Sequence, residues 1–339
     1  MNAERNTLKE AWTADEVLDL GRAYQGAAVL AAAAELELFT PLAAGPRTAA
    51  ELAQTLDCDF RGLKILLDAL AALRLLHKHG DTYSPAPGAT ALLTPASPQT
   101  VLAMAQHQAN CLRRWAQLAK VVKTGQPADR ILSVRGETGD QESFIGAMHN
   151  ISQPIAREVI TAVQPLAFKH LLDLGGASGT WTMAFLRECP AASATIFDLP
   201  HVIPMAARRL KESGLANRVT LVAGDFMHDA LPAGADLTWV SAIVHQNSRE
   251  QNRELFSKVF TALEPGGQIV IRDIIMEEGR TQPVAGALFA INMLVATEGG
   301  GTFTFDELRE DLEVAGFVRA ALVRRDPGMH SLLEAHRPD

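Results

Sequence analysis

Residues 171–181 read LLDLGGASGTW, and this segment decides how the second half of the chain folds. Its apolar run is typical of a buried strand, its small residues of a tight turn, and the residues from Thr180 onward of a helix. Glycine tolerates a positive φ and lets a ligand come close to the backbone, and the first turn of a helix offers unpaired N–H groups. The segment therefore predicts a strand, a glycine-rich turn and a helix, with a ligand site at the turn.

More strands follow this one at regular spacing. Short apolar runs that alternate with helix-length stretches lie at 193–197, 219–223, 236–241 and 268–273. Such alternation is typical of βαβ units and of an open, mostly parallel sheet. The last two runs, 318–323 and 330–335, are too close together for a crossover helix, so we expect an antiparallel final strand. The predicted fold class is α/β, with a Rossmann-like domain at 166–339 built on a mostly parallel seven-stranded sheet.

The first half of the chain reads as helices with one short hairpin. Apolar residues at helical spacing predict three helices, over 16–38, 49–56 and 61–73. Asp59 can cap the third helix, and two short extended pieces around Gly80 and Asp81 follow it. Three helices and a hairpin make a winged-helix pattern. We predict an all-helical winged-helix domain over 12–100 and a helical connector over 101–165.

A winged helix can read DNA or make subunit contacts, and the charge of this chain favours subunit contacts. The 339 residues include 31 Lys and Arg against 39 Asp and Glu, a formal net charge of −8 at pH 7. Nucleic-acid surfaces need clustered cations. The predicted third helix offers only Arg61, Lys64 and Arg74. We therefore expect no nucleic-acid partner.

The composition also bears on compartment and metals. No apolar run is long enough to span a membrane, and the N-terminal stretch MNAERNTLKEAW is too polar for a signal peptide. Cys58, Cys111 and Cys189 are widely spaced, which fits reduced thiols and gives no metal-site spacing. We expect a cytoplasmic protein with no membrane partner and no metal.

The glycine turn fits one nucleotide-like ligand better than another. Counted from Gly175, the dinucleotide fingerprint G-x-G-x-x-G fails, because Ala177 and Thr180 occupy the second and third glycine positions. The spacing D-x-G-x-(G/A)-x-G is satisfied by Asp173, Gly175, Ala177 and Gly179. That spacing is typical of S-adenosylmethionine binding, so we predict this cofactor.

Acidic residues at the ends of the next two strands support the same cofactor. Asp198 lies 198 − 173 = 25 residues after Asp173, where a carboxylate can accept both ribose hydroxyls. Asp225 can meet the adenine amino group, and Phe226 can cover the ring. The predicted cofactor-binding residues are Asp173, Gly175, Gly176, Gly179, Asp198, Leu199, Gly224, Asp225, Phe226 and Ser241.

Together with TIFDLPHV at 195–202, a His after the fourth strand and LEPGGQIVIRD at 263–273, these motifs resemble a known family. It is the S-adenosylmethionine-dependent small-molecule O-methyltransferases of the caffeic acid, hydroxyindole and bacterial natural-product types. The resemblance covers nearly the whole chain. It implies a small-molecule acceptor and a homodimer formed by the N-terminal domain, whose helices complete each active site.

Methyl transfer to a hydroxyl needs alignment and a base, and His245 is our candidate. It follows the fourth predicted strand at the carboxyl edge of the sheet, before a helix that Asn247 or Ser248 can cap. A helix N-terminus disfavours imidazolium. Asp273 ends the next strand and should point into the same crevice. The resemblance implies that His245 is the general base and that Asp273 orients it.

Other readings of these two residues remain open. His245 can merely complete its loop, and Asp273 can instead pair with Arg272 or Arg280.

The chain departs from its relatives at two places. They usually have His-Asp-Trp or His-Asn-Trp, where this chain has His245-Gln246-Asn247 and lacks the aromatic wall. They also carry G-G-x-E-R-T, where Thr302 stands here at the second acidic position. Either Asp273 suffices alone, or the acceptor is acidic, or the enzyme keeps the cofactor for non-methylating chemistry. A DNA-binding regulator that senses S-adenosylmethionine is a further alternative.

The acceptor is expected to be a phenolic or enolic hydroxyl of a small apolar metabolite. The glycines at 299–301 suggest room for it. The predicted pocket residues are Trp115, Met148, His149, Asn292, Met293 and Thr302. For Trp115, Met148 and Met293, ordinary core packing is an equal alternative.

Overall fold

The computed structural model describes residues 11–339, which form two compact units. The first contains the chain up to Leu112 and the segment Leu132–Asp140, and the second contains Arg113–Ile131 and Gln141–Asp339. The predicted connector is thus divided between the units, and the three-part division stays a prediction. Most of the polar N-terminal stretch lies outside the described residues. No helix in the described part of the chain is long and apolar enough to cross a membrane.

The first unit is helical with one small sheet. Its elements are α1 (Ala14–Arg22), α2 (Tyr24–Glu35), α3 (Phe39–Leu42), β1 (Arg47–Thr48), α4 (Ala49–Thr55), α5 (Phe60–Ala72), β2 (Leu76–His79), β3 (Thr82–Pro85), α6 (Ala89–Leu93) and most of α7 (Leu102–Trp115). Asp59 caps α5 by accepting from the N–H of Gly62 at 2.7 Å. The strands pair antiparallel in the order β1-β3-β2. The winged-helix arrangement is therefore present, with a third short strand that the sequence did not predict.

The predicted first helix, 16–38, is two helices. Ala23 separates α1 from α2. The second helix ends at Glu35, because Glu37 takes a positive φ of 49° and the N–H of Leu38 bonds the carbonyl of Ala33 at 3.0 Å. This is the usual way in which a helix C-terminus closes on itself.

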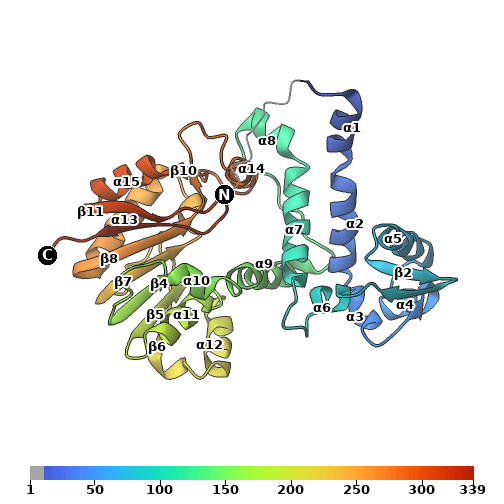
Figure 1. Ribbon diagram of the computed structural model, residues 1–339, viewed down its shortest axis with the longest axis horizontal. Helices are drawn as coiled ribbons and strands as arrows, with labels where there is room; N and C mark the ends of the chain where they lie inside the picture. The colour runs from blue at the N-terminus through green and yellow to red at the C-terminus, as the bar shows by residue number, and fades with distance from the viewer. Residues whose placement is uncertain (1–10) are drawn as a thin grey trace, which may run out of the picture. The chain divides into compact units, whose positions relative to one another are not determined.

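The second unit is the predicted α/β domain (Figure 1). Its elements are the end of α7, α8 (Leu118–Thr124), most of α9 (Gly136–Ser152), α10 (Ala156–Ile160), β4 (His170–Leu174), α11 (Thr180–Glu188), β5 (Ser193–Asp198), α12 (Ile203–Glu212), η1 (Ala216–Arg218), β6 (Val219–Ala223), β7 (Ala235–Ser241), η2 (Val244–Gln246), α13 (Arg249–Ala262), β8 (Leu263–Asp273), β9 (Ile275–Met276), α14 (Val284–Ala296), β10 (Phe303–Thr304), α15 (Phe305–Val314), β11 (Val318–Arg324) and β12 (Ser331–His336). The seven-stranded sheet has the order β11-β12-β8-β7-β4-β5-β6.

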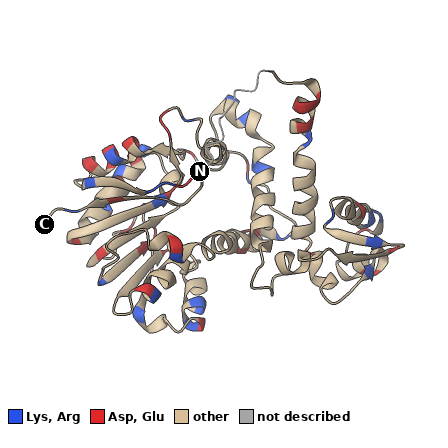
Figure 2. Cartoon of the chain, in the orientation of Figure 1, with Lys and Arg blue, Asp and Glu red and all other residues tan. Residues whose placement is uncertain are grey.

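Side chains alternate between the two faces of the sheet along each strand. Both faces of this sheet carry buried apolar residues, and helices cover both. Leu172 and Ile271 pack with the buried side chains of α13 and α15. Leu171 and Val270 pack with those of α10 and α11. Figure 2 shows segments coloured for acidic and for basic residues interspersed on the outer helices of this unit.

The sheet is parallel from β8 through β6, and β12 runs antiparallel to both β8 and β11. The antiparallel final strand is therefore confirmed. Because the carboxyl ends of parallel strands share one edge, the segments after β4, β5, β6, β7 and β8 gather there. These segments contain most of the predicted site.

Candidate functional site

The loop between β4 and α11 has the backbone that its glycines allow. Gly175, Ala177 and Gly179 take positive φ values of 64°, 46° and 73°. A Cβ added at Gly175 would lie 2.6 Å from the Cδ1 of Ile243, which precedes η2. Glycine is required at this position by both its φ and its contact. The loop therefore packs directly against the turn that carries His245.

Asp198, at the end of β5, ties the loop to the next strand. Its Oδ2 accepts from the N–H of Ala177 and its Oδ1 from the N–H of Leu199, both at 2.7 Å. Burial raises the pKa of Asp198, and these two N–H groups oppose that shift. Each carboxylate oxygen can accept further hydrogen bonds, so the residue fits a ligand with vicinal hydroxyls.

Asp173 is fully buried below the same loop. Its Oδ2 accepts from the backbone N–H and the hydroxyl of Thr182, at 3.2 and 2.5 Å. Its Oδ1 has no hydrogen-bond partner among the described residues. Burial raises the pKa of Asp173 to about 7, with a smaller contribution from the charge of Asp198. A buried acceptor without a partner is costly, and a polar ligand group held at the glycine loop is the kind of partner it lacks.

The loop after β6 is closed by its own residues. Asp225 accepts from the N–H of Met227 at 2.9 Å and donates its own N–H to the Oδ2 of Asp229 at 2.8 Å. One oxygen of Asp225 is thus committed to the turn, and the other lies 4.0 Å from the Nε2 of His228 in the same loop. Phe226 is half-buried against the core on the α13 side of the sheet. Gly224 precedes these residues at the end of β6.

Sequence reasoning missed Lys258, which fixes this loop. Its Nζ on α13 donates to the carbonyls of Phe226, Met227 and Asp229 at 3.0, 2.7 and 3.2 Å. The contact joins residues about 30 positions apart, so no local pattern signals it.

Ser241 is hydrogen-bonded to a buried arginine. Its Oγ accepts from the Nε of Arg272 at 2.7 Å, and the Arg272 guanidinium lies 4.6 Å from the Trp181 ring centroid. Burial lowers the pKa of Arg272 to about 10, although the charge of Asp273 opposes this. Ser241 thus has a partner within the protein, and Arg272 does not take the role of partner to Asp273 that we considered for it.

The partner of Asp273 is His245. The Nδ1 of His245 lies 2.9 Å from both Oδ1 and Oδ2 of Asp273. Both side chains are buried, at 8% and 1% exposure. Asp273 also accepts from the N–H of Ile274 at 2.8 Å, which fixes the carboxylate. With Nδ1 held this way, Nε2 is the nitrogen that can exchange a proton with a ligand.

The other alternative for Asp273, Arg280, lies elsewhere. Arg280 donates to the carbonyl of Thr302 at 3.0 Å and pairs with Glu307. Thr302 is buried, and its backbone is used in this contact. Ser248 caps α13 and forms a reciprocal pair with Gln251, as the sequence predicts.

An aromatic side chain does face His245, from a different element than in the expected motif. Phe289 on α14 meets the imidazole edge to face, with ring centroids 4.8 Å apart and an interplanar angle of 90°. Helical spacing relative to the predicted pocket residues Asn292 and Met293 was the available signal for it.

Two of the glycines at 299–301 contact the backbone of the turn that carries His245. The N–H of Gly301 donates to the carbonyl of His245 at 2.9 Å. A Cβ at Gly300 would lie 2.5 Å from that same oxygen. The expectation that these glycines leave room for an acceptor is thus wrong at Gly300, because glycine here permits close packing of two backbone segments.

The predicted pocket residues fall into separate groups. Trp115, at the end of α7, donates its indole N–H to the Oδ1 of Asn292 on α14 at 3.0 Å. His149 on α9 instead meets the cofactor loop, with its Nδ1 2.8 Å from the hydroxyl of Thr180. Burial lowers the pKa of His149 to about 4, and the charge of Arg209 acts the same way. Met293 is buried and Met148 half-buried.

No group of three or more His, Cys, Asp or Glu residues in the described part of the chain could hold a metal ion.

Comparison with known proteins gives two family matches. Residues 115–318 match an O-methyltransferase domain, and residues 19–95 match an O-methyltransferase dimerisation domain.

Individual relatives span most of the chain. A 3-hydroxy-5-methyl-1-naphthoate 3-O-methyltransferase of Streptomyces sahachiroi is 32% identical, and the match covers 90% of each chain. The N,N-dimethyltransferase OxyT of Streptomyces rimosus is 31% identical over 90% of each. The crystal structure of human N-acetylserotonin methyltransferase in complex with S-adenosylmethionine is 25% identical, with a TM-score of 0.82 over 98% of this chain and 100% of that one.

Proposed function

This chain belongs to the O-methyltransferase family, and from that premise we propose that it methylates a phenolic or enolic hydroxyl of a small, largely apolar metabolite. S-Adenosylmethionine, when bound, would supply a methyl group whose carbon is the electrophile, and the sulfonium sulfur would leave with the C–S electron pair as a neutral thioether. Asp173, Asp198 and the backbone of residues 175–180 hold this cofactor. The observation that carries the proposal is the buried His245–Asp273 contact at the same sheet edge as the glycine loop.

His245 removes the proton of the acceptor through Nε2. Asp273 accepts the hydrogen bond from Nδ1–H, which selects that tautomer and stabilises the imidazolium once the proton has been taken. Both carboxylate oxygens lie 2.9 Å from Nδ1. This double contact supports Asp273 as sufficient without the second acidic residue that Thr302 replaces.

The surroundings of His245 support an apolar, aromatic acceptor. Phe289 lies against one side of the imidazole, and edge-to-face packing is also open to a phenolic ring. Trp115 and Asn292 bond to each other, and they stay in the proposal as residues of the acceptor pocket.

The cations of the winged-helix unit support subunit contact over DNA binding. Asp68 lies 3.3 Å from the Nζ of Lys64 and 2.6 Å from that of Lys78, and it accepts from the Tyr83 hydroxyl at 2.5 Å. These bonds hold the pKa of Asp68 well below its usual range. One carboxylate thus pairs with two of this unit's cations and offsets one of their two positive charges.

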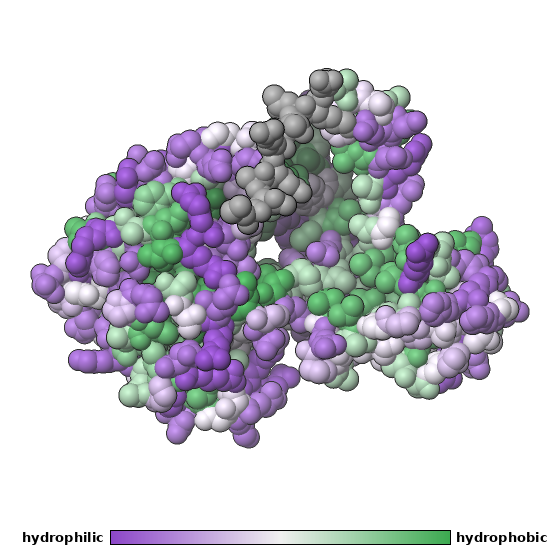
Figure 3. Space-filling view, viewed as in Figure 1, coloured by the Kyte–Doolittle hydropathy of each residue, from purple (hydrophilic) through white to green (hydrophobic). Residues whose placement is uncertain are grey.

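We also propose a homodimer formed through the dimerisation domain. Val17, Leu18, Leu20 and Tyr24 on α1 and α2 are between 52% and 67% exposed. Figure 3 shows hydrophobic residues exposed among hydrophilic ones on the unit that carries these helices. Exposed apolar patches of this kind mark interaction surfaces. Light scattering should give twice the chain mass, and Leu20→Asp should shift the measured mass toward that of the monomer.

The three unpatterned cysteines support a cytoplasmic location.

The activity is tested with labelled cofactor and a panel of phenols, enols and aryl amines. We expect label in the phenol or enol products, and labelling that is slower by about 100-fold or more with a His245→Ala variant. Label in amines alone would replace the hydroxyl acceptor by an amine, as the name of the relative OxyT indicates for that protein. Cofactor binding without any transfer would favour non-methylating chemistry, and sequence-selective retention of DNA at physiological salt would favour a regulator.

A further inference from the structure

The turn that carries His245 is held by a side chain of its own and by groups from outside it. Gln246 donates from Nε2 to the carbonyl of Ala242 at 2.9 Å, and the N–H of Gly301 donates to the carbonyl of His245 at 2.9 Å. The carbonyls of Ile243 and Val244 lie between these two, and that of Val244, the residue before the base, also accepts from the N–H of Asn247 at 3.3 Å. Its position in η2 decides the direction in which the His245 side chain leaves the backbone.

Asn252 binds the carbonyl of Val244. Asn252 lies in the first turn of α13 and is 0% exposed. Its Nδ2 donates to the Val244 oxygen at 2.9 Å, and its Oδ1 accepts from the Nδ2 of Asn247 at 3.1 Å. Because a backbone carbonyl oxygen can only accept, the Val244 oxygen determines that the Asn252 amide turns its nitrogen toward it, and the Asn247 amide matches this orientation by donating to the Asn252 oxygen. Asn247 is itself buried, and it occupies the place of the expected aromatic residue.

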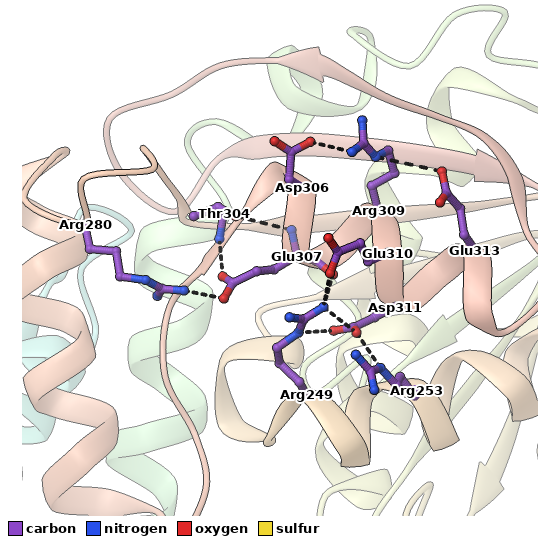
Figure 4. A network of polar contacts seen from close by, with 10 residues as sticks. All are labelled: Arg249, Arg253, Arg280, Thr304, Asp306, Glu307, Arg309, Glu310, Asp311 and Glu313. Atoms are coloured by element: carbon purple, nitrogen blue, oxygen red, sulfur yellow. Dashed lines mark hydrogen bonds and ion pairs between the residues drawn. The ribbon is translucent and has the colours of Figure 1, made fainter.

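The helix that carries Asn252 is fixed to its neighbour by charge. Arg249 and Arg253, on either side of Asn252, both bind the buried Asp311 of α15, at 2.8 and 2.6 Å (Figure 4). Arg249 also binds the carboxylate of Glu310 at 2.9 Å. The first turn of α13 is thus a rigid base from which the Asn252 amide reaches the catalytic turn.

We infer that Asn252, which is bonded to Asn247, is a positioning residue that sets the His245 imidazole for proton removal. The inference rests on the proposed function. Asn252 touches neither substrate nor the reacting atoms; it acts through the Val244 carbonyl. Small displacements of a catalytic group lower turnover steeply while leaving substrate binding intact.

The test variant is Asn252→Asp. It keeps the shape and the acceptor for Asn247, but it places a carboxylate oxygen against the Val244 carbonyl. We expect kcat to fall by about 10-fold or more, with KM for cofactor and acceptor within about 2-fold of wild type. Ser257→Ala is the matched control, because it removes an exposed side-chain hydrogen bond to the carbonyl of Arg253, at 2.8 Å, on the same helix. Its kcat should equal that of wild type.

Asn247→Ala provides a second variant should Asn252→Asp unfold. It removes only the outer bond, so we expect a smaller fall in kcat in the same direction. All assays are made well below the unfolding midpoint of each variant. A kcat within 2-fold of wild type in both variants overturns the inference, as does a loss confined to KM.

A readout without turnover separates this inference from the proposed function. Nitrogen-15 spectra of labelled histidine, with His245 assigned by a His245→Gln variant, report the Nδ1–H bonded to Asp273. Asn252→Asp should shift that signal, and Ser257→Ala should not. An unchanged signal overturns the positioning role even if the wild type proves to transfer no methyl group. A shifted signal with an inactive wild type overturns the proposed function alone.

Discussion

The glycine loop at 175–179 and the catalytic turn at 242–247 lie at the same sheet edge, but they are built in opposite ways. The glycine loop is shaped by its own backbone, with three positive φ values within five residues. The catalytic turn has one positive φ, at Ala242, and besides its own local bonds it is held by Asp273, Asn252 and Gly301 from other segments of the chain. Cofactor binding can therefore depend on a local backbone conformation, while catalysis depends on contacts between residues that are far apart in the sequence. The two should fail independently when mutated.

The largest effect is expected from a substitution in the catalytic turn that leaves the glycine loop intact. His245→Ala should lower turnover by about 100-fold or more, because it removes the base. Cofactor affinity should stay within about 2-fold, because His245 makes no hydrogen bond to the glycine loop. Steady-state kinetics and titration calorimetry measure the two quantities. His77→Ala, on the exposed strand β2, is the control. A comparable loss of cofactor affinity would show that the two loops are not independent.

The second substitution removes contacts that hold the glycine loop and leaves the catalytic turn intact. Asp198→Ala removes the acceptor of the Ala177 and Leu199 N–H groups and the proposed ribose contact. Hydrogen bonds to a charged group predict about 10- to 100-fold weaker cofactor binding. At saturating cofactor, kcat should change little. Asp198→Asn should lose less affinity than Asp198→Ala. Equal cofactor affinity in Asp198→Ala and wild type would contradict the ribose role.

A third prediction sharpens the comparison through pH. The pKa of Asp173 is raised to about 7, so the folded chain keeps this proton where the unfolded chain has lost it. Its contribution to stability is present at low pH and is lost as pH rises through 7, by about 1 kcal/mol between pH 6 and pH 8. Asp173→Asn should lack this loss, so it gains stability relative to wild type as pH rises. Urea unfolding at both pH values measures the difference, which a constant offset would refute.

The smallest effect concerns the aromatic neighbour of the base. Phe289→Ala should lower kcat by about 3- to 5-fold, because an edge-to-face contact contributes about 1 kcal/mol. Phe289→Leu keeps much of the volume and separates packing from ring geometry. Measurement of kcat for both variants at saturating cofactor distinguishes the effect of lost packing volume from that of lost ring geometry. Full activity in Phe289→Ala would mean that Asp273 and the backbone contacts orient the imidazole without it.

The sequence predicted the strands and the glycine loop because local patterns determine both. The β4 strand, the cap of α5 by Asp59 and the antiparallel β12 depend on short-range spacing, and the structure has all three. The division of the first helix at Ala23 was not predicted, because alanine is a strong helix former and carries no local stop signal.

The catalytic turn was predicted only in part. His245 and Asp273 could be named because each follows a strand. Asn252, Phe289 and Lys258 were missed, because each acts on a segment that only the fold brings near. The glycines before Thr302 were read as space because the sequence does not show that Gly300 lies against the His245 carbonyl.

The polypeptide passes between its two compact units three times, near residues 112, 131 and 140. Truncation at any one position therefore cannot release either unit whole. On the ribosome, the N-terminal unit stays incomplete until residues 132–140 emerge, by which time α8 has already been synthesised. Cotranslational folding of the two units is thus interleaved, and the order of synthesis alone does not separate them into independent folding events.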